Sequence, residues 1–237
     1  MNVIRSAVVA ALVVVSGARV EAQLPSAAQI YDKYATAVGG RDAWAKVVGR
    51  TETGTADITF AGLSGTYERH SAEPNKMRMI IDLGMAKVDQ GFDGTFGWAV
   101  QPMGAATRMD PAQEKNLAAE TMTGAGFLDP SRFAKVSVDA KETFEGVECY
   151  KVTVTRKSGE TAVEYFEVES GLRRGTVAST PMGEQKTSFF DYKDFEGKKI
   201  ASKIVQATPQ GDVVLIIAAV KFGAPDPALF KLPDGIK

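Results

Sequence analysis

Residues 146–211 read GVECYKVTVTRKSGETAVEYFEVESGLRRGTVASTPMGEQKTSFFDYKDFEGKKIASKIVQATPQG. Six of its glycines, at positions 146, 159, 171, 183, 197 and 211, are spaced at intervals of 13, 12, 12, 14 and 14 residues. Each lies in a polar patch between runs rich in Val, Tyr, Phe, Thr and Ile, which favour strands, and glycine suits tight turns. The spacing predicts an antiparallel meander with strands of about ten residues.

The segment from residue 23 to residue 49 predicts two helices. Ser26 followed by Gln29 forms a capping box, apolar residues recur behind it at helical spacing, and Gly39-Gly40 ends the helix. Asp42 reads as the N-cap of a short second helix that presents Trp44. We therefore expect a helical start before the strands begin.

From Arg50 onward the apolar period falls to two, which is typical of strands. Asp93-Gly94 is a tight-hairpin signal, while Asp110-Pro111 and Asp129-Pro130 each predict the start of a helical piece. The alternating sets are Ala56, Ile58 and Phe60, then Met77, Met79 and Ile81, then Phe96, Trp98 and Val100. With the meander, these predict about ten strands.

A sheet of that size must twist and curl, so it has a concave face that something must fill. Either the chain's own helices or a ligand could fill it. Six of the seven methionines after residue 22 lie between Met77 and Met122. Flexible thioethers suit apolar surfaces that adapt to variable partners, although ordinary core packing explains them equally well.

Composition excludes several classes of function. The 237 residues include 28 basic and 29 acidic ones, which gives no basic excess for nucleic acid. A single cysteine and a single histidine exclude an internal disulfide and the zinc motifs that need several such ligands. We expect no cofactor and no metal.

Residues 1–22 have the organisation of a secretory signal peptide. Arg5 precedes the apolar run AVVAALVVV, and Val20-Glu21-Ala22 places small residues where a signal peptidase cuts. The run is shorter than the about 20 residues that span a bilayer, although an uncleaved anchor is the alternative. We expect cleavage after Ala22, a periplasmic location, and one domain over residues 23–237.

Several motifs, taken in order, resemble the LolA-like periplasmic proteins that sort outer-membrane lipoproteins. They are Glu73–Met79 (EPNKMRM), Gly91–Trp98 (GFDGTFGW), Pro102, and Asp226–Gly235 (DPALFKLPDG). The resemblance implies an α+β fold, an incomplete antiparallel β-barrel with a helical lid around an apolar cavity that holds acyl chains. Members of that family shuttle lipoproteins to the outer membrane, carry other lipids, or act as envelope-stress sensors.

One position departs from the family pattern. Lipoprotein carriers typically have arginine immediately before the proline that leads the strand, whereas this chain has Glu73. A guanidinium only donates hydrogen bonds and a carboxylate only accepts them, so the same lid contacts cannot form. Arg78 could serve a related role from a different position. The resemblance therefore supports a cavity more strongly than a lipoprotein cargo.

Two other classes of function compete with a carrier. An enzyme would have to use His70, which we expect on the surface, or Cys149, which we expect to be a buried apolar group, and nothing in the sequence brings them together. An envelope sensor of the same fold would usually carry a second domain, and the chain ends at Lys237 just after the closing motif. We therefore expect a non-enzymatic carrier.

The resulting hypothesis is a monomeric carrier for the acyl chains of a lipoprotein or lipid, with docking proteins at the inner and outer membranes as possible partners. The residues expected to line its cavity come from the early strands, the lid and the last long strand. They are Met77, Met79, Ile81, Trp98, Val100, Leu117, Met122, Phe127, Leu215 and Ile217. The last long strand (Val213 to Val220) is apolar on both sides, so its inward face stays open, and a reversed register would replace each named residue there by its neighbour.

Overall fold

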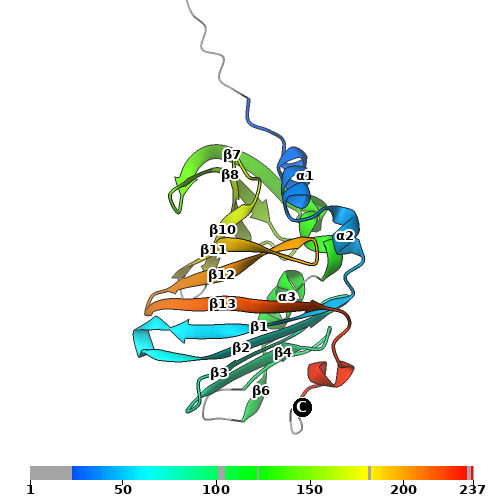
Figure 1. Cartoon of the computed structure of the whole chain (residues 1–237), viewed down its shortest axis with the longest axis vertical. Coiled ribbons are helices and arrows are strands. Elements are labelled where there is room, and N and C mark those ends of the chain that lie inside the picture. Colours follow the sequence, from blue (N-terminus) through cyan, green and yellow to red (C-terminus); the bar gives the residue numbers. More distant parts are fainter. Residues whose placement is uncertain (1–22, 101–104, 122, 181–182, 234–235, 237) are drawn as a thin grey trace, which may run out of the picture.

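The computed structural model describes residues 23–100, 105–121, 123–180, 183–233 and 236, which form one antiparallel sheet of 13 strands with helices on its concave side (Figure 1). The first group of strands comprises β1 (Gly49–Ile58), β2 (Leu63–Ala72), β3 (Lys76–Asp82), β4 (Lys87–Phe92), β5 (Gly97–Val100) and β6 (Ala106–Arg108). The second comprises β7 (Lys135–Phe144), β8 (Val147–Thr155), β9 (Thr161–Glu167), β10 (Arg173–Thr180), β11 (Gly183–Phe195), β12 (Lys198–Thr208) and β13 (Gly211–Phe222).

The strand order explains how two meanders become one sheet. The order is β6-β5-β4-β3-β2-β1-β13-β12-β11-β10-β9-β8-β7, so β1 pairs with the last strand of the chain as well as with β2. The edges are β6 and β7, and the sheet stays unclosed. This arrangement confirms the expected incomplete antiparallel barrel.

The predicted meander is confirmed, and its turns show why glycine recurs. At the β7–β8 and β11–β12 turns, Glu145 and Glu196 have φ of 48° and 53°, and the glycines after them, Gly146 and Gly197, both have φ of 76°. Two successive positive φ values match a type I′ hairpin, which fits the right-handed twist of the flanking strands. The glycine at the second position adopts this conformation without steric cost.

The first half contains more strands than we predicted. Six strands precede α3, where we expected four or five. The additional short strands escaped notice because β4, with the sequence KVDQGF, lacks clear alternation, and β6 has only three residues. Phe60, which we placed on a strand, lies in the 3-10 helix η1 (Thr59–Ala61) and is exposed. Phe96 likewise precedes β5.

The sequence predicted the N-terminal boundary of the first helix correctly and that of the second helix incorrectly. In α1 (Ala27–Ala37), Gln29 N donates to Ser26 Oγ at 3.2 Å and Ser26 N donates to Gln29 Oε1 at 2.8 Å, so the capping box is confirmed. For α2 (Arg41–Ala45) the N-cap is Gly40, and Asp42 lies in the first turn, so our assignment of Asp42 as N-cap was wrong.

The helical interruption begins where the Asp-Pro pairs predicted. In α3 (Pro111–Glu120), Asp110 and Gln113 exchange hydrogen bonds between side chain and backbone at 2.9 and 3.1 Å. Two 3-10 helices follow, η2 (Gly124–Leu128) and η3 (Pro130–Arg132), and Asp129 Oδ1 accepts a hydrogen bond from Ser131 N at 2.8 Å. Local capping chemistry therefore fixes both starts.

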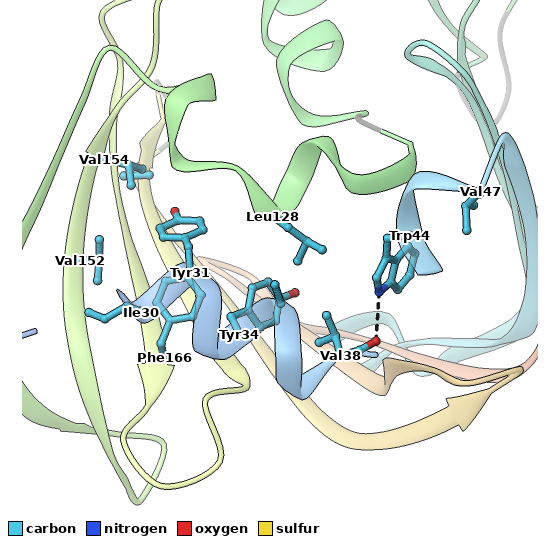
Figure 2. Packing of buried hydrophobic residues seen from close by; sticks show 12 residues of the cluster. Ile30, Tyr31, Tyr34, Val38, Trp44, Val47, Leu128, Val152, Val154 and Phe166 are labelled. Carbon is cyan, nitrogen blue, oxygen red and sulfur yellow. Dashed lines mark hydrogen bonds between the residues drawn. The ribbon is translucent and has the colours of Figure 1, made fainter. Parts of the chain in front are cut away.

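The main hydrophobic core lies where α1 packs against β8 and β9, and η2 joins α1 to α2 (Figure 2). Tyr31 and Phe166 approach with ring centroids 5.1 Å apart. Trp44 donates from Nε1 to the carbonyl of Val38 at 3.0 Å, and its ring meets Phe127 edge-on at 4.8 Å. The chain's own helices thus fill one end of the concave side.

A smaller core cluster lies on the strands beyond that filled end. It consists of Ala56, Tyr67, Ile81, Leu215 and Ile217. These residues come from β1, β2, β3 and β13, which are neighbours in the sheet. Between the two clusters the concave side is hollow.

Candidate functional site

Two adjoining cavities occupy the concave side of the sheet. The larger has a volume of about 660 Å³ and the smaller about 180 Å³. Their linings share Arg69, Arg132, Arg173, Phe189 and Ile204. The cavities therefore meet at this group of five residues. A volume of several hundred Å³ falls within the range of small-molecule sites, roughly 300–1,000 Å³.

The larger cavity is lined by residues from strands that are remote in the sheet order. Met79 on β3 and Ala162 on β9 both face it. Side chains alternate between the two faces of a strand, so the inward positions of each strand point to one hollow once the sheet curls. The apolar part of the lining consists of Tyr67, Met79, Ala118, Phe133, Val154, Ala162, Ala178, Phe189, Ile204 and Leu215.

A buried carboxylate on β9 holds two guanidinium groups at the junction of the cavities. Glu164 Oε1 accepts from Arg132 Nη2 and from Arg173 Nη1, each at 3.1 Å. Glu164 Oε2 accepts a short hydrogen bond from the hydroxyl of Tyr31 on α1. The Glu164 side chain is only 5% exposed. We call these four residues, Glu164, Arg132, Arg173 and Tyr31, the Glu164 cluster.

The surroundings of the cluster keep its hydroxyl protonated and its guanidiniums in place. Burial and the adjacent Glu164 charge raise the pKa of Tyr31 well above its usual range, so the phenol remains a donor. The Arg173 guanidinium lies over the Phe189 ring at 4.7 Å, and that of Arg132 lies over Phe133 at 4.2 Å. Such cation–π contacts fix the planes of both groups. The structure thus corrects the expectation of a wholly apolar hollow.

Four of the ten residues predicted from the sequence line a cavity. Met79 and Leu215 line the larger cavity, and Phe127 and Ile217 line the smaller one. Leu215 and Ile217 share the inner face of β13, a face that the sequence left open because this strand is apolar on both sides. Contact of these residues with a ligand stays a prediction.

The other predicted residues lie outside the described linings. Met77 and Ile81 are buried on β3, and Val100 on β5 and Leu117 on α3 are half-buried. Trp98 is fully buried. Met122 lies outside the described residues.

Trp98 packs against the neighbouring strand. A Cβ atom added at Gly91 would lie 2.1 Å from Trp98 Cζ2, so the ring covers the position that the glycine leaves open. Gly91 and Trp98 are paired across β4 and β5. The Gly91–Trp98 motif quoted from the sequence therefore has a packing role in this structure.

Sequence reasoning missed the charged part of the site. Glu164 stands between Ala162 and Phe166 on the inward side of β9, and Arg69 follows Tyr67 on the inward side of β2. A charge at an inward position of an alternating strand is the signal that could have found them. Arg132 carries no such signal, because it lies at the end of η3.

The two side chains considered for catalysis are buried and lie on strands far apart in the sheet order. Burial raises the pKa of the Cys149 thiol to about 11 and lowers the pKa of His70, despite the opposing effect of Glu68. His70 is 5% exposed, so the expectation of a surface residue was wrong. Six strands separate β8, which carries Cys149, from β2, which carries His70.

Glu73 lies against the segment that carries α3, η2 and η3, which corresponds to the expected lid, whereas Arg78 binds elsewhere. A Cβ atom added at Gly124, the first residue of η2, would be 2.8 Å from Glu73 Oε1. Arg78 instead pairs with Asp89 through two hydrogen bonds of 2.9 and 2.7 Å and donates to the carbonyl of Leu229 at 3.3 Å. Arg78 therefore anchors the C-terminal segment and does not replace the missing lid arginine.

Within the described ranges, no set of three or more His, Cys, Asp or Glu side chains is placed to hold a metal ion. Among the helices of those ranges, none has the length and apolar character needed to cross a bilayer.

Comparison with solved structures identifies the fold as LolA-like. A DUF1329 family protein from Desulfovibrio piger aligns with a TM-score of 0.60 at 13% identity, over 86% of this chain and 96% of that one. A putative outer membrane lipoprotein-sorting protein domain from Vibrio parahaemolyticus gives 0.56 at 14% identity, over 85% and 95%. A LolA superfamily protein from Nitrosomonas europaea gives 0.56 at 12% identity, over 88% and 98%. No protein-family model and no curated protein matches the sequence.

Proposed function

We propose that this chain is a carrier that binds the acyl chains of a lipid or lipoprotein in the larger cavity and moves them through the periplasm. The observation that carries the proposal is the cavity of about 660 Å³ on the inner face of a LolA-like sheet, with Met79, Ile204 and Leu215 on its apolar wall. Two of the structures that share this fold are described as a lipoprotein-sorting protein and a LolA superfamily protein, which supports the same reading.

Binding by such a carrier needs no chemistry. Each methylene group removed from water contributes about 0.8 kcal/mol, so one long acyl chain supplies ample affinity. Release then requires the lid to open or a receptor to bind the cargo more tightly. The buried Cys149 thiol and the remote His70 support binding over catalysis.

The periplasmic location rests on the sequence of residues 1–22, which we propose to be a cleaved signal peptide, with residues 23–237 as the carrier domain. Docking proteins at the inner and outer membranes would load and unload it. We propose that it acts as a monomer.

The lid is the segment that carries α3, η2 and η3. At Gly124 it lies close to Glu73, in the turn between β2 and β3, and to the carbonyls of Trp44 and Val47. A carboxylate at position 73 cannot donate the hydrogen bonds that an arginine would. We therefore propose that the lid opens by a contact different from that of the lipoprotein carriers, and that the cargo includes lipids other than lipoproteins.

The proposal is tested by what the protein binds. The mature chain is purified from an envelope extract for lipid mass spectrometry and is titrated with a fluorescent fatty acid. We expect acyl species to co-purify and the probe to bind. A protein free of lipid that also fails to bind the probe would contradict the proposal.

A matched pair of variants locates the binding site. Met79→Glu replaces part of the apolar wall of the larger cavity by a carboxylate and is expected to weaken probe binding at least about tenfold, because the acyl chain would then lie against a polar group that binding strips of water. Met85→Glu makes the same change at a side chain that is 81% exposed and is expected to leave binding unchanged. Equal effects of the two substitutions would place the probe elsewhere.

A further inference from the structure

The two cavities carry a charge opposite to that of the whole chain. Among the described residues, seven cationic side chains line one or both cavities, whereas the carboxylates there are Glu52 and Glu164. The cationic residues are Arg50, Arg69, Arg132, Arg156, Lys157, Arg173 and Lys199. Seven minus two leaves a formal charge of +5 on the linings, although the full chain has a net charge of −1.

Part of this excess charge is buried at the junction of the cavities. One Glu164 oxygen serves both Arg132 and Arg173, whose side chains are 13% and 22% exposed, so the pair retains one uncompensated positive charge. Within the described part of the chain, the Nε atoms of both arginines are buried and have no hydrogen-bond partner. Uncompensated charge and unmet donors are expensive to bury, and an anion at this point would offset the cost of the charge.

We propose that the cavity selects an amphiphile with an anionic headgroup, a phosphate or a carboxylate, which binds Arg132 and Arg173 while the acyl chain lies along Met79, Ile204 and Leu215. This inference rests on the proposed carrier function and names the chemical class of its ligand. Guanidinium groups bind phosphate and carboxylate through paired hydrogen bonds, and their fixed planes over Phe133 and Phe189 present those donors in advance.

The geometry of the two cavities supports an amphiphile over a free anion. Arg132 and Arg173 lie where the cavities join, and the apolar wall of the larger cavity extends from that junction over β12, β13 and β3. A ligand with its headgroup at the junction can therefore place its chain on apolar surface. Inorganic phosphate would satisfy the arginines and leave that surface in contact with water.

The test compares ligands that share an acyl or alkyl chain of one length and differ in having an anionic or a neutral headgroup. Delipidated mature protein is titrated by calorimetry with lysophosphatidic acid and with the neutral monoacylglycerol of the same chain, and separately with palmitate and hexadecanol. Charge-assisted hydrogen bonds favour the anionic member of each pair by about tenfold or more. Inorganic phosphate alone is the third arm, and we expect it to bind far more weakly than lysophosphatidic acid.

Two variants link this preference to the named arginines. Arg132→Gln and Arg173→Gln are each expected to reduce the preference for the anionic ligand about tenfold while the neutral ligand binds as before. Lys193→Gln removes one positive charge at an exposed position of β11 outside both linings and is expected to keep the full preference. Thermal unfolding of each variant shows whether it is folded. If a variant does not fold, the comparison of anionic and neutral ligands on the wild-type protein still tests the inference.

Each outcome decides between the proposals. Equal binding of charged and neutral ligands would overturn the headgroup inference and leave the carrier function intact. Failure of every amphiphile to bind would overturn both. Binding of inorganic phosphate as tight as that of lysophosphatidic acid would show an anion site and overturn the inference of an amphiphile.

Discussion

Replacing Glu164 by glutamine tests whether the Glu164 cluster holds the lid and α1 to the sheet. The substitution keeps the shape of the side chain and removes its charge. In the folded protein this carboxylate accepts hydrogen bonds from Arg132, Arg173 and the hydroxyl of Tyr31, which come from η3, from β10 and from α1. The change therefore leaves two partly buried guanidiniums without a counterion.

The structure sets the size of the expected effect. Breaking a buried ion pair from one side costs roughly 3–5 kcal/mol. The guanidinium side chains are 13% and 22% exposed, so water screens part of this cost, and the amide oxygen of glutamine still accepts one hydrogen bond. We therefore expect Glu164→Gln to lower the free energy of unfolding by about 3 kcal/mol, at the low end of the range.

Urea and thermal unfolding at pH 7 measure this loss. For a chain of this length, 1 kcal/mol corresponds to roughly 2–4 °C, so the melting temperature should fall by roughly 6–12 °C. Glu148→Gln, at an exposed position of β8, is the matched control and should change stability little. A loss for Glu164→Gln within about 0.5 kcal/mol of that control would refute the idea that the cluster stabilises the fold.

Three further predictions concern the buried groups outside the cavity. Burial raises the pKa of Cys149 to about 11, so a thiol reagent at pH 8 should label it only as fast as the protein unfolds, and rapid labelling of native protein would contradict this burial. Gly91→Ala places a methyl group against the Trp98 ring and should cost about 1–3 kcal/mol in urea unfolding, whereas an unchanged midpoint would show that the ring moves freely. Burial lowers the pKa of His70, so the folded protein takes up a proton there less readily than the unfolded chain does. The free energy of unfolding should therefore fall as the pH drops from about 6.5, the ordinary pKa of histidine, to 5. The same drop in pH should cost His70→Gln less stability. A titration of the single histidine by NMR with a pKa above its ordinary value would refute the last prediction.

Local signals located most of the elements. The repeated glycines of the second half mark turns, the Ser26 capping box starts α1, and the Asp-Pro pairs start α3 and η3. Each of these signals acts over a few residues, so it can be read without knowing the rest of the chain. The short strands β4 and β6 were not predicted, because they lack a clear local pattern and are held mainly by pairing with neighbouring strands.

The candidate site was predicted only in part. Alternation placed Met79 on an inward position, and the structure puts it at a cavity wall. Leu215 and Ile217 also line the cavities, but β13 is apolar on both sides, so alternation left its inward face open. The same reasoning expected Trp98 to line the cavity, but its ring covers Gly91 instead. Whether a large side chain on an inward position meets a cavity or a neighbouring strand depends on packing across strands, which periodicity does not record.

The sequence by itself determined an antiparallel sheet of strands joined by tight turns, with helices at the start and in the middle of the chain. It could do so because turn glycines, helix caps and period-two alternation act locally. Only the tertiary structure decided that the hollow is charged as well as apolar. Arg69 and Arg173 are more than 100 residues apart in the chain, and they meet because β1 pairs with β13 and the sheet then curls. Strand order and curvature are set by pairing across the whole sheet, so no local stretch specifies them.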